Sequence, residues 1–183
     1  LPDVGTIEFA HQRPAIQFQE PRLFSFLNVM ENILVPFEAV RKKPTRHELI
    51  QLQTWLQVTG LDEFTKHYPY QLSGGMKQKA ALIRAVMANP TFLLLDEPFQ
   101  SIEIESKQEI LAHFRRNYSD STVLLITHSP REVLLLANRA LVFRSPHLFG
   151  KDSLMIEDVN NYFERLQINS VSVSRSYDQV NLA

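Results

Sequence analysis

Cysteine is absent from the 183 residues of this chain, and glycine and tryptophan are scarce, with five residues and one residue respectively. The lack of cysteine excludes disulfide bonds and thiolate metal ligands. The 19 lysines and arginines nearly balance the 20 aspartates and glutamates, so no basic surface for nucleic acid or an anionic membrane is expected. No apolar run approaches the roughly 18–20 residues of a membrane span, and the start lacks a signal-peptide pattern. These absences predict a soluble cytoplasmic polypeptide.

The sequence does contain alternating strand and helix patterns after residue 88. The apolar runs Thr91–Leu95 and Thr122–Thr127 are typical of buried parallel strands, and Ala140–Phe143 predicts a third strand. The helices predicted between them are Ser101–Arg116 and Pro130–Asn138. This alternation predicts an α/β fold with a doubly wound parallel sheet. Residues 21–88 break the alternation and are mainly helical in pattern, so we expect an inserted helical subdomain there.

Capping and breaker residues delimit the helices of this subdomain. Thr45–Glu48 has capping-box spacing ahead of a helix that Gly60 ends. Leu61–Tyr68 suggests a second, short helix, and Met76–Met87 is a strong helix candidate. Ahead of the subdomain, two short strands are expected at Thr6–Phe9 and Ala15–Phe18.

The pattern is weaker beyond Ser145. Met155–Leu166 has amphipathic spacing, which predicts a helix that packs onto the body of the protein. Residues 170–183 are polar and rich in serine, and we expect them to form a disordered tail.

Leu72–Gly75 reads Leu-Ser-Gly-Gly at the expected start of the helix Met76–Met87. Ser73 can cap this helix, and two residues without a Cβ let a phosphate approach backbone N–H groups at the positive end of the helix dipole. The alternative is a capped helix that follows a glycine turn and binds nothing. The basic residues around Gln78, together with carboxylates further along the chain, favour the phosphate site.

Asp96 and Glu97 follow the apolar strand Thr91–Leu95. Carboxylates at a strand end can hold Mg²⁺ and can orient or deprotonate an attacking water, although such a pair can also merely begin a loop. His128 follows the next buried strand, and a single histidine is more often structural or solvated than functional. Because adjacent parallel strands end at the same edge of a sheet, where ligands bind, we expect Glu97 and His128 to lie close together there.

In this order and spacing, Leu72–Gly75 and Phe92–Pro98 resemble the signature and Walker B motifs of ABC-type ATPases. The Leu-Ile-Thr-His stretch that ends at His128 resembles their switch histidine. The segment Phe18–Leu23 with its continuation Asn28–Ile33 is similar to the Q-loop region of importer cassettes, in the branch that serves nitrate, sulfonate and taurine. The resemblance implies a P-loop-NTPase-like α/β cassette in which a helical subdomain is inserted into a parallel sheet.

The resemblance implies ATP and Mg²⁺ as cofactors and gives individual residues a role. Glu97 is the implied catalytic glutamate, and His128 contacts the γ-phosphate. Asp96 and Gln19 are the implied Mg²⁺ residues. The implied nucleotide-binding residues are Gln19, Ser73, Gly74, Gly75 and Gln78. The D-loop position holds Ser101 and Glu103, where the family commonly has aspartate in place of the glutamate.

The resemblance also implies partners. In this family the signature contacts ATP bound to the opposite subunit, so a second ABC cassette is expected in a head-to-tail dimer. An importer cassette implies transmembrane permease subunits, an indirect link to a solute-binding protein, and no nucleic acid. The chain is therefore expected to be cytoplasmic and peripheral, on the inner face of the cell membrane, where its ATP hydrolysis energises solute uptake.

One motif of the family is absent, because the sequence has no G-x-x-x-x-G-K-[ST] phosphate loop. In the family this loop lies shortly before the strand that Thr6–Phe9 resembles, and the chain begins at Leu1. We therefore expect a truncated form that lacks the N-terminal strands and the P-loop. Without the lysine and the amide cradle for the β- and γ-phosphates, this chain is not expected to hydrolyse ATP alone.

These patterns together predict five parts of the chain. They are residues 1–20, a partial ATPase core up to the Q-loop; 21–88, the helical subdomain with the signature; 89–145, the ATPase core with Walker B, D-loop and switch histidine; 146–169, a C-terminal helix; and 170–183, the tail. Two alternatives stay open: a degenerate or regulatory cassette that supplies its signature in trans, and a soluble ABC ATPase unconnected with transport. The intact Glu97 and His128 disfavour the first, and the near-neutral charge disfavours the second.

Overall fold

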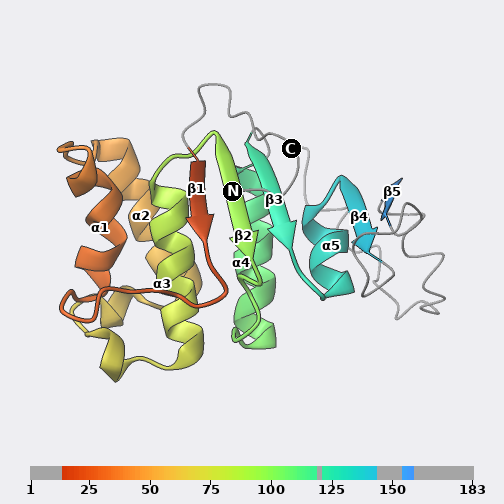
Figure 1. Cartoon of the computed structure of the whole chain (residues 1–183). Helices are drawn as coiled ribbons and strands as arrows, with labels where there is room; N and C mark the ends of the chain where they lie inside the picture. The colour runs from red at the N-terminus through yellow and green to blue at the C-terminus, as the bar shows by residue number, and fades with distance from the viewer. Residues whose placement is uncertain (1–13, 119–120, 144–153, 159–183) are drawn as a thin grey trace, which may run out of the picture. The chain divides into compact units, whose positions relative to one another are not determined.

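The computed structural model describes residues 14–118, 121–143 and 154–158. The chain divides into two compact units, residues 1–128 and 129–183. The first unit contains a parallel sheet of three strands in the order β1–β2–β3, with β2 in the centre (Figure 1). The strands are β1 (Pro14–Gln17), β2 (Phe92–Asp96) and β3 (Thr122–Ile126). The parallel sheet with its crossover helices confirms the predicted α/β class.

The helices of this unit lie in the two crossovers. They are α1 (Val29–Ala39), α2 (Arg46–Thr59), the 3-10 turns η1 (Asp62–Phe64) and η2 (Pro69–Gln71), α3 (Gly74–Met87) and α4 (Ile104–Asn117). In Figure 1, α3 runs beside β1 and packs against both β1 and α1, while α2 packs against α4. In the described residues no helix is long and apolar enough to cross a membrane.

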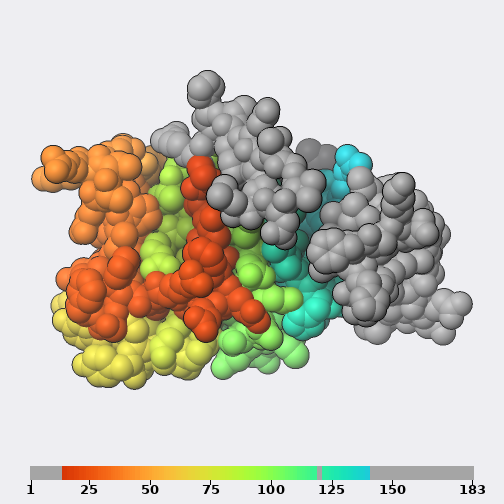
Figure 2. Space-filling model, viewed as in Figure 1, coloured from red at the N-terminus to blue at the C-terminus, as the bar shows by residue number. Residues whose placement is uncertain are grey.

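One face of the sheet is buried and the other is not. Leu93 and Leu95 of β2 are fully buried, as expected for a central strand under helices. On the opposite face, apolar side chains are about half exposed. They are Ile16 (47%), Leu124 (48%) and Ile126 (48%). Residues of β1 are accordingly visible at the surface in Figure 2. The apolar strands therefore predicted parallel pairing correctly, but the described residues bury only one face of the sheet.

Capping chemistry fixes the predicted helix boundaries. Thr45 caps α2 and forms a reciprocal capping box with Glu48, and Gly60 ends the helix with a φ of 67°. This confirms the predicted start and end of α2. The prediction of a short helix over Leu61–Tyr68 was wrong for most of its length, because only the 3-10 turn η1 forms there.

A buried asparagine organises the segment that precedes α1. Asn32 has no exposed surface, and its Nδ2 donates to the carbonyls of Phe24, Leu27 and Asn28 at 3.1, 2.9 and 3.0 Å. Its Oδ1 accepts the N–H of Phe24 at 2.8 Å. One side chain therefore hydrogen-bonds four backbone groups of the loop that leads into α1.

The second unit contains α5 (Pro130–Leu136) and an antiparallel pair, β4 (Arg139–Phe143) with β5 (Leu154–Asp158). The predicted strand at Ala140–Phe143 is present, but it does not extend the parallel sheet. The predicted C-terminal helix is wrong over its first residues, since Met155 begins no helix and lies inside β5. In a short apolar run, periodicity cannot distinguish a helix from a strand. Here the pairing with β4 makes the run a strand.

Several predictions fall outside the described residues. They concern the strand Thr6–Phe9, the rest of the C-terminal helix within 146–169, and the tail 170–183.

The capping box of α2 makes a specific prediction about pH. Hydrogen bonds from the backbone and side chain of Thr45, with Lys42 Nζ at 3.0 Å, lower the pKa of Glu48 to about 2. A carboxyl whose folded pKa is depressed stabilises the fold above its unfolded pKa, and this contribution is lost as the pH falls through the folded value. Denaturation of Thr45→Ala should show a loss of about 1 kcal/mol at pH 7 and a smaller fall in stability between pH 5 and pH 2. Thr45→Ser should match the wild type, and an unchanged pH profile in Thr45→Ala would contradict the assignment.

Candidate functional site

The carboxyl end of β2 carries two acidic residues. Asp96 is the last residue of the strand, and Glu97 follows with a φ of 45°, in the left-handed region that favours glycine. The N–H of Glu97 donates to the carbonyl of Ile126 at 2.9 Å, which ties this turn to the end of β3. The chain therefore turns sharply after Asp96 and places Glu97 at the edge of the sheet.

Glu97 and His128 meet at this edge. Oε1 of Glu97 accepts the backbone N–H of His128 at 3.0 Å and lies 2.7 Å from Nδ1 of the imidazole. The Glu97 side chain is largely buried, whereas the His128 ring is exposed. A fixed carboxylate beside an accessible imidazole can orient a water molecule and hold a proton at the solvent boundary. The structure thus brings together the two residues that were predicted to share one edge.

The start of α3 presents the other predicted binding group. Ser73 caps the helix through its Oγ, which accepts the N–H of Met76 at 3.2 Å. Ser73 and Gly74 are exposed, and a Cβ built on Gly74 would meet no atom within 4 Å. The N-terminus of this helix of 14 residues is therefore open to solvent at Ser73 and Gly74, at the positive end of the helix dipole, where an anion can bind.

Gly75 is packed more tightly than Gly74. A Cβ on Gly75 would lie 2.5 Å from the backbone oxygen of Ser101. This distance is far inside van der Waals contact, so glycine is what lets α3 approach the segment 97–101. The predicted D-loop residue Ser101 therefore lies directly against the predicted phosphate-binding turn.

Gln78, one turn further along α3, faces the interior. It is 3% exposed, and its Nε2 donates to the carbonyl of Glu97 at 3.2 Å. Its amide is thus engaged within this chain and does not face the solvent side of the helix, where Ser73 and Gly74 lie. Glu103, the remaining predicted D-loop residue, is exposed and precedes α4 as its N-cap, without a side-chain capping bond.

Gln19 follows β1 at the same edge of the sheet, since Gln17 of β1 is in register with Leu95 of β2. The Nε2 of Gln19 donates to Oε1 of Gln100 at 3.4 Å. The segment after Gln19 is held by Arg84 of α3, whose guanidinium donates to the carbonyls of Pro21 and Arg22 at 2.9 and 3.0 Å. Burial lowers the pKa of Arg84.

The oxygen donors at this edge fit Mg²⁺ that is bound together with a phosphate. Among the described residues no group of three His, Asp or Glu side chains can hold a metal by itself. Mg²⁺ commonly takes one or two protein oxygens and completes its octahedron with phosphate oxygens and water. Asp96 at the end of β2, with the amide oxygen of Gln19 in the turn that follows β1, matches such an incomplete set.

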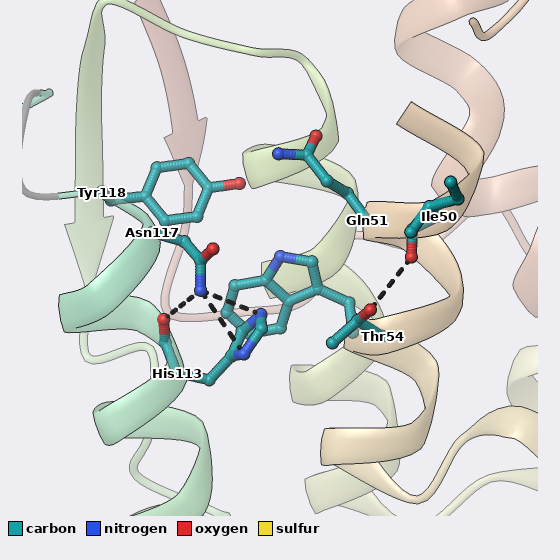
Figure 3. A pocket seen from close by; sticks show the side chains of 7 residues that line it. Ile50, Gln51, Thr54, His113, Asn117 and Tyr118 are labelled. Atoms are coloured by element: carbon teal, nitrogen blue, oxygen red, sulfur yellow. Dashed lines mark hydrogen bonds between the residues drawn. The ribbon is translucent and has the colours of Figure 1, made fainter. Parts of the chain in front are cut away.

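A small cavity lies away from this edge, between α2 and α4 (Figure 3). Its volume is about 80 Å³, and it is lined by Ile50, Gln51, Thr54, Trp55, His113, Asn117 and Tyr118. The rings of Trp55 and His113 pack edge to face, with 4.5 Å between their centroids. Burial lowers the pKa of His113, and the charge of Arg116 lowers it further. Pockets for ligands of drug size measure roughly 300–1,000 Å³, so this cavity is too small for a nucleotide.

Sequence reasoning missed several residues that organise the site. Arg84 and Gln100 carry no local pattern, although a single arginine within the apolar stretch Ala-Leu-Ile-Arg-Ala-Val was a usable sign. Gln17 is also unusual, because both polar atoms of its buried side chain have no hydrogen-bond partner among the described residues. A glutamine two residues after Ala15, and so on the same face of the expected strand as this apolar residue, was the sign for it.

Comparisons with known proteins show which family the chain resembles. A family model described as ABC transporter matches residues 2–100. The chain is 37% identical over 153 residues to the sulfate/thiosulfate import ATP-binding protein CysA of Mycobacterium bovis, which covers 77% of this chain and 43% of that protein. It is 35% identical over 144 residues to the aliphatic sulfonates import ATP-binding protein SsuB of Bacillus cereus, which covers 77% of this chain and 55% of that protein. The chain spans about half the length of the curated relatives it matches.

A solved structure shares the fold. The dimeric post-hydrolysis state of the ATP-binding cassette MJ0796, bound to ADP and Pi, matches with a TM-score of 0.60 and 25% sequence identity. The match covers 70% of this chain and 57% of that chain.

The contrast between the two glycines of α3 can be tested by substitution. Gly75→Ala should lower the free energy of unfolding by about 1–3 kcal/mol, because the added methyl group overlaps the backbone of Ser101. Gly74→Ala is the matched control, and it should be neutral or stabilising by up to about 1 kcal/mol, since its methyl group points into open space. Urea denaturation measures both, and equal effects of the two substitutions would rule out the close approach.

Proposed function

The chain belongs to the ABC transporter family, and from that premise we propose that it is an ATP-binding and ATP-hydrolysing subunit that energises solute uptake through a membrane permease. The observation that carries this proposal is the contact between Glu97 and His128 beside Asp96, at the carboxyl edge of a parallel sheet. Such an arrangement suits in-line attack of water on a terminal phosphate.

Each residue at the edge then has a defined task. Glu97 accepts a proton from the attacking water or orients it, and His128 contacts the γ-phosphate. Asp96 and Gln19 hold Mg²⁺, which neutralises charge on the phosphate oxygens when it is bound. Because Glu97 is held through both its N–H and its carboxylate, it is oriented before nucleotide arrives.

A second copy of the cassette is part of this proposal. Ser73 and Gly74 are exposed on the outer side of α3, and they are free to contact a phosphate held by another chain. A head-to-tail dimer that sandwiches two ATP molecules would use the start of α3 from one copy with Glu97 and His128 from the other. The dimeric state of the matched cassette MJ0796 supports this arrangement.

ATP hydrolysis requires a phosphate loop in addition to these residues. The 183 residues contain no G-x-x-x-x-G-K-[ST] sequence, so we propose that this stretch of chain does not hydrolyse ATP by itself. The two curated relatives import sulfate, thiosulfate and aliphatic sulfonates. A small oxyanion or sulfonate is accordingly the class of solute that we propose.

Exposed aromatic side chains offer a place for the permease, at the inner face of the membrane. Phe26 is 73% exposed, and the centroid of its ring lies 5.7 Å from that of Phe24. Tyr70 is exposed as well and stacks on Tyr68. The hydrogen bond from Val29 N to the carbonyl of His67 joins the two segments. Exposed aromatic rings of this kind are enriched at protein interfaces.

The role of Glu97 is tested by Glu97→Gln in a form of the protein that carries a phosphate loop ahead of Leu1. The amide cannot accept a proton, so ATP turnover should fall by about 10²- to 10⁴-fold, while ATP still drives dimerisation. Phosphate release and size-exclusion chromatography with ATP measure the two properties. Glu109→Gln, an exposed position on α4, is the matched control. Steady-state hydrolysis retained in Glu97→Gln would refute the proposed role.

The permease contact is tested by Phe26→Asp. A charge at this exposed ring should weaken co-purification with the permease about tenfold or more and leave ATP-driven dimerisation unchanged, because Phe26 is not among the residues proposed to hold the nucleotide. Leu49→Asp makes the same chemical change at an exposed position of α2 and should have no effect. Wild-type permease binding by Phe26→Asp would exclude this surface.

A further inference from the structure

We propose that Gln78 is a positioning residue for Glu97: its side-chain amide holds the turn after β2 in the conformation that keeps the Glu97 carboxylate beside His128. The resemblance to the signature motif implied that Gln78 contacts nucleotide. Its burial and its hydrogen bond give it a different task. This inference rests on the catalytic role proposed for Glu97.

The turn at Glu97 requires external support. A glutamate with a φ of 45° is in a region that costs of the order of 1 kcal/mol or more for a residue with a Cβ. Two backbone contacts restrain it, from its N–H to the carbonyl of Ile126 at 2.9 Å and from Gln100 N to its carbonyl at 3.3 Å. The carbonyl oxygen has two lone pairs, so it can accept a further donor beside Gln100 N–H.

Gln78 is that donor. Its Nε2 lies 3.2 Å from the carbonyl of Glu97, and the side chain is 3% exposed. A buried primary amide is costly unless it is hydrogen-bonded, and the neighbouring buried residues of α3 are apolar, namely Ala80, Ala81, Leu82 and Ile83. A glutamine at this point of an apolar helix face is explained by the carbonyl that it meets.

The same helix touches the turn at a second point. Gly75 and Gln78 are three residues apart and therefore lie on one face of α3. Gly75 meets the carbonyl of Ser101, and Gln78 meets the carbonyl of Glu97. Helix α3 thus contacts the segment 97–101 at both of its ends, at Glu97 through Gln78 and at Ser101 through Gly75. A displacement of α3 when its N-terminus meets a phosphate would be transmitted to Glu97 of the same chain.

Hydrogen exchange tests this link whether or not the protein hydrolyses ATP. In Gln78→Met, which keeps the length of the side chain and removes the donor, the backbone amides of Glu97 and Gln100 should exchange roughly two- to tenfold faster, as expected for the loss of one hydrogen bond. Gln53→Met, the same change at an exposed position of α2, is the control. Wild-type exchange at both amides in Gln78→Met would overturn the proposal.

Kinetics in the form that carries a phosphate loop separate positioning from general damage. Gln78→Met should lower kcat about tenfold, with KM for ATP and ATP-driven dimerisation unchanged. Gln78→Glu adds a diagnostic pH dependence, because a neutral carboxyl can donate to the Glu97 carbonyl and a carboxylate cannot. The ratio of its kcat to that of the wild type should therefore rise as the pH falls. A change in KM for ATP with kcat unchanged in Gln78→Met would contradict the positioning role. A kcat ratio of Gln78→Glu to wild type that does not depend on pH would also contradict it.

The outcomes also separate this inference from the proposed function. If the wild type and Gln53→Met both fail to hydrolyse ATP in the form that carries a phosphate loop, the proposed function is wrong, and the exchange rates at Glu97 and Gln100 still decide whether Gln78 holds the turn. If both hydrolyse ATP and Gln78→Met does so at the wild-type rate, the inference alone is wrong. Should Gln78→Met not fold, Gln78→Glu supplies both measurements.

Discussion

The left-handed backbone at Glu97 is the constraint on which the site depends. A strand that ended at Asp96 in ordinary extended or helical geometry would not bring the next side chain to His128. The conformation is unfavourable for glutamate, so it persists only because the surrounding chain holds it. The end of β3 fixes its N–H, the helix α3 and Gln100 share its carbonyl, and His128 fixes its carboxylate. Two parts of the chain that are distant in sequence, α3 and the segment from Ile126 to His128, therefore converge on one residue.

Much of this could be predicted from the sequence, because the features concerned are local or follow from general topology. The box formed by Thr45 and Glu48 and the stop at Gly60 involve residues within a few positions, and the structure reproduces them. The apolar runs that became β2 and β3 are parallel and adjacent, so the residues following them had to meet at one edge. The meeting of Glu97 with His128 is a consequence of that rule.

The rest depends on contacts that no local pattern records. A glycine is needed at position 75 because the backbone of Ser101, 26 residues later in the chain, lies against it. The glutamine at position 78 is explained by the carbonyl of Glu97, which follows the next strand. Arg84 is explained only by the loop after Gln19. The short apolar run at 154–156 could pair as a strand or wind as a helix, and the presence of β4 opposite decides between them. Tertiary partners override local preference wherever an element is short.

The uncovered side of the sheet affects how this polypeptide behaves in bulk solution. Ile16, Leu124 and Ile126 expose about half of their surface on a flat parallel face, and apolar area of this kind attracts its own copies. A formal net charge of −1 supplies almost no mutual repulsion to oppose that attraction near neutral pH. Self-association of the chain should therefore increase with protein concentration, and it should decrease when another surface covers this apolar face. The balanced composition supplies little of the electrostatic repulsion that would help to keep the chain monomeric.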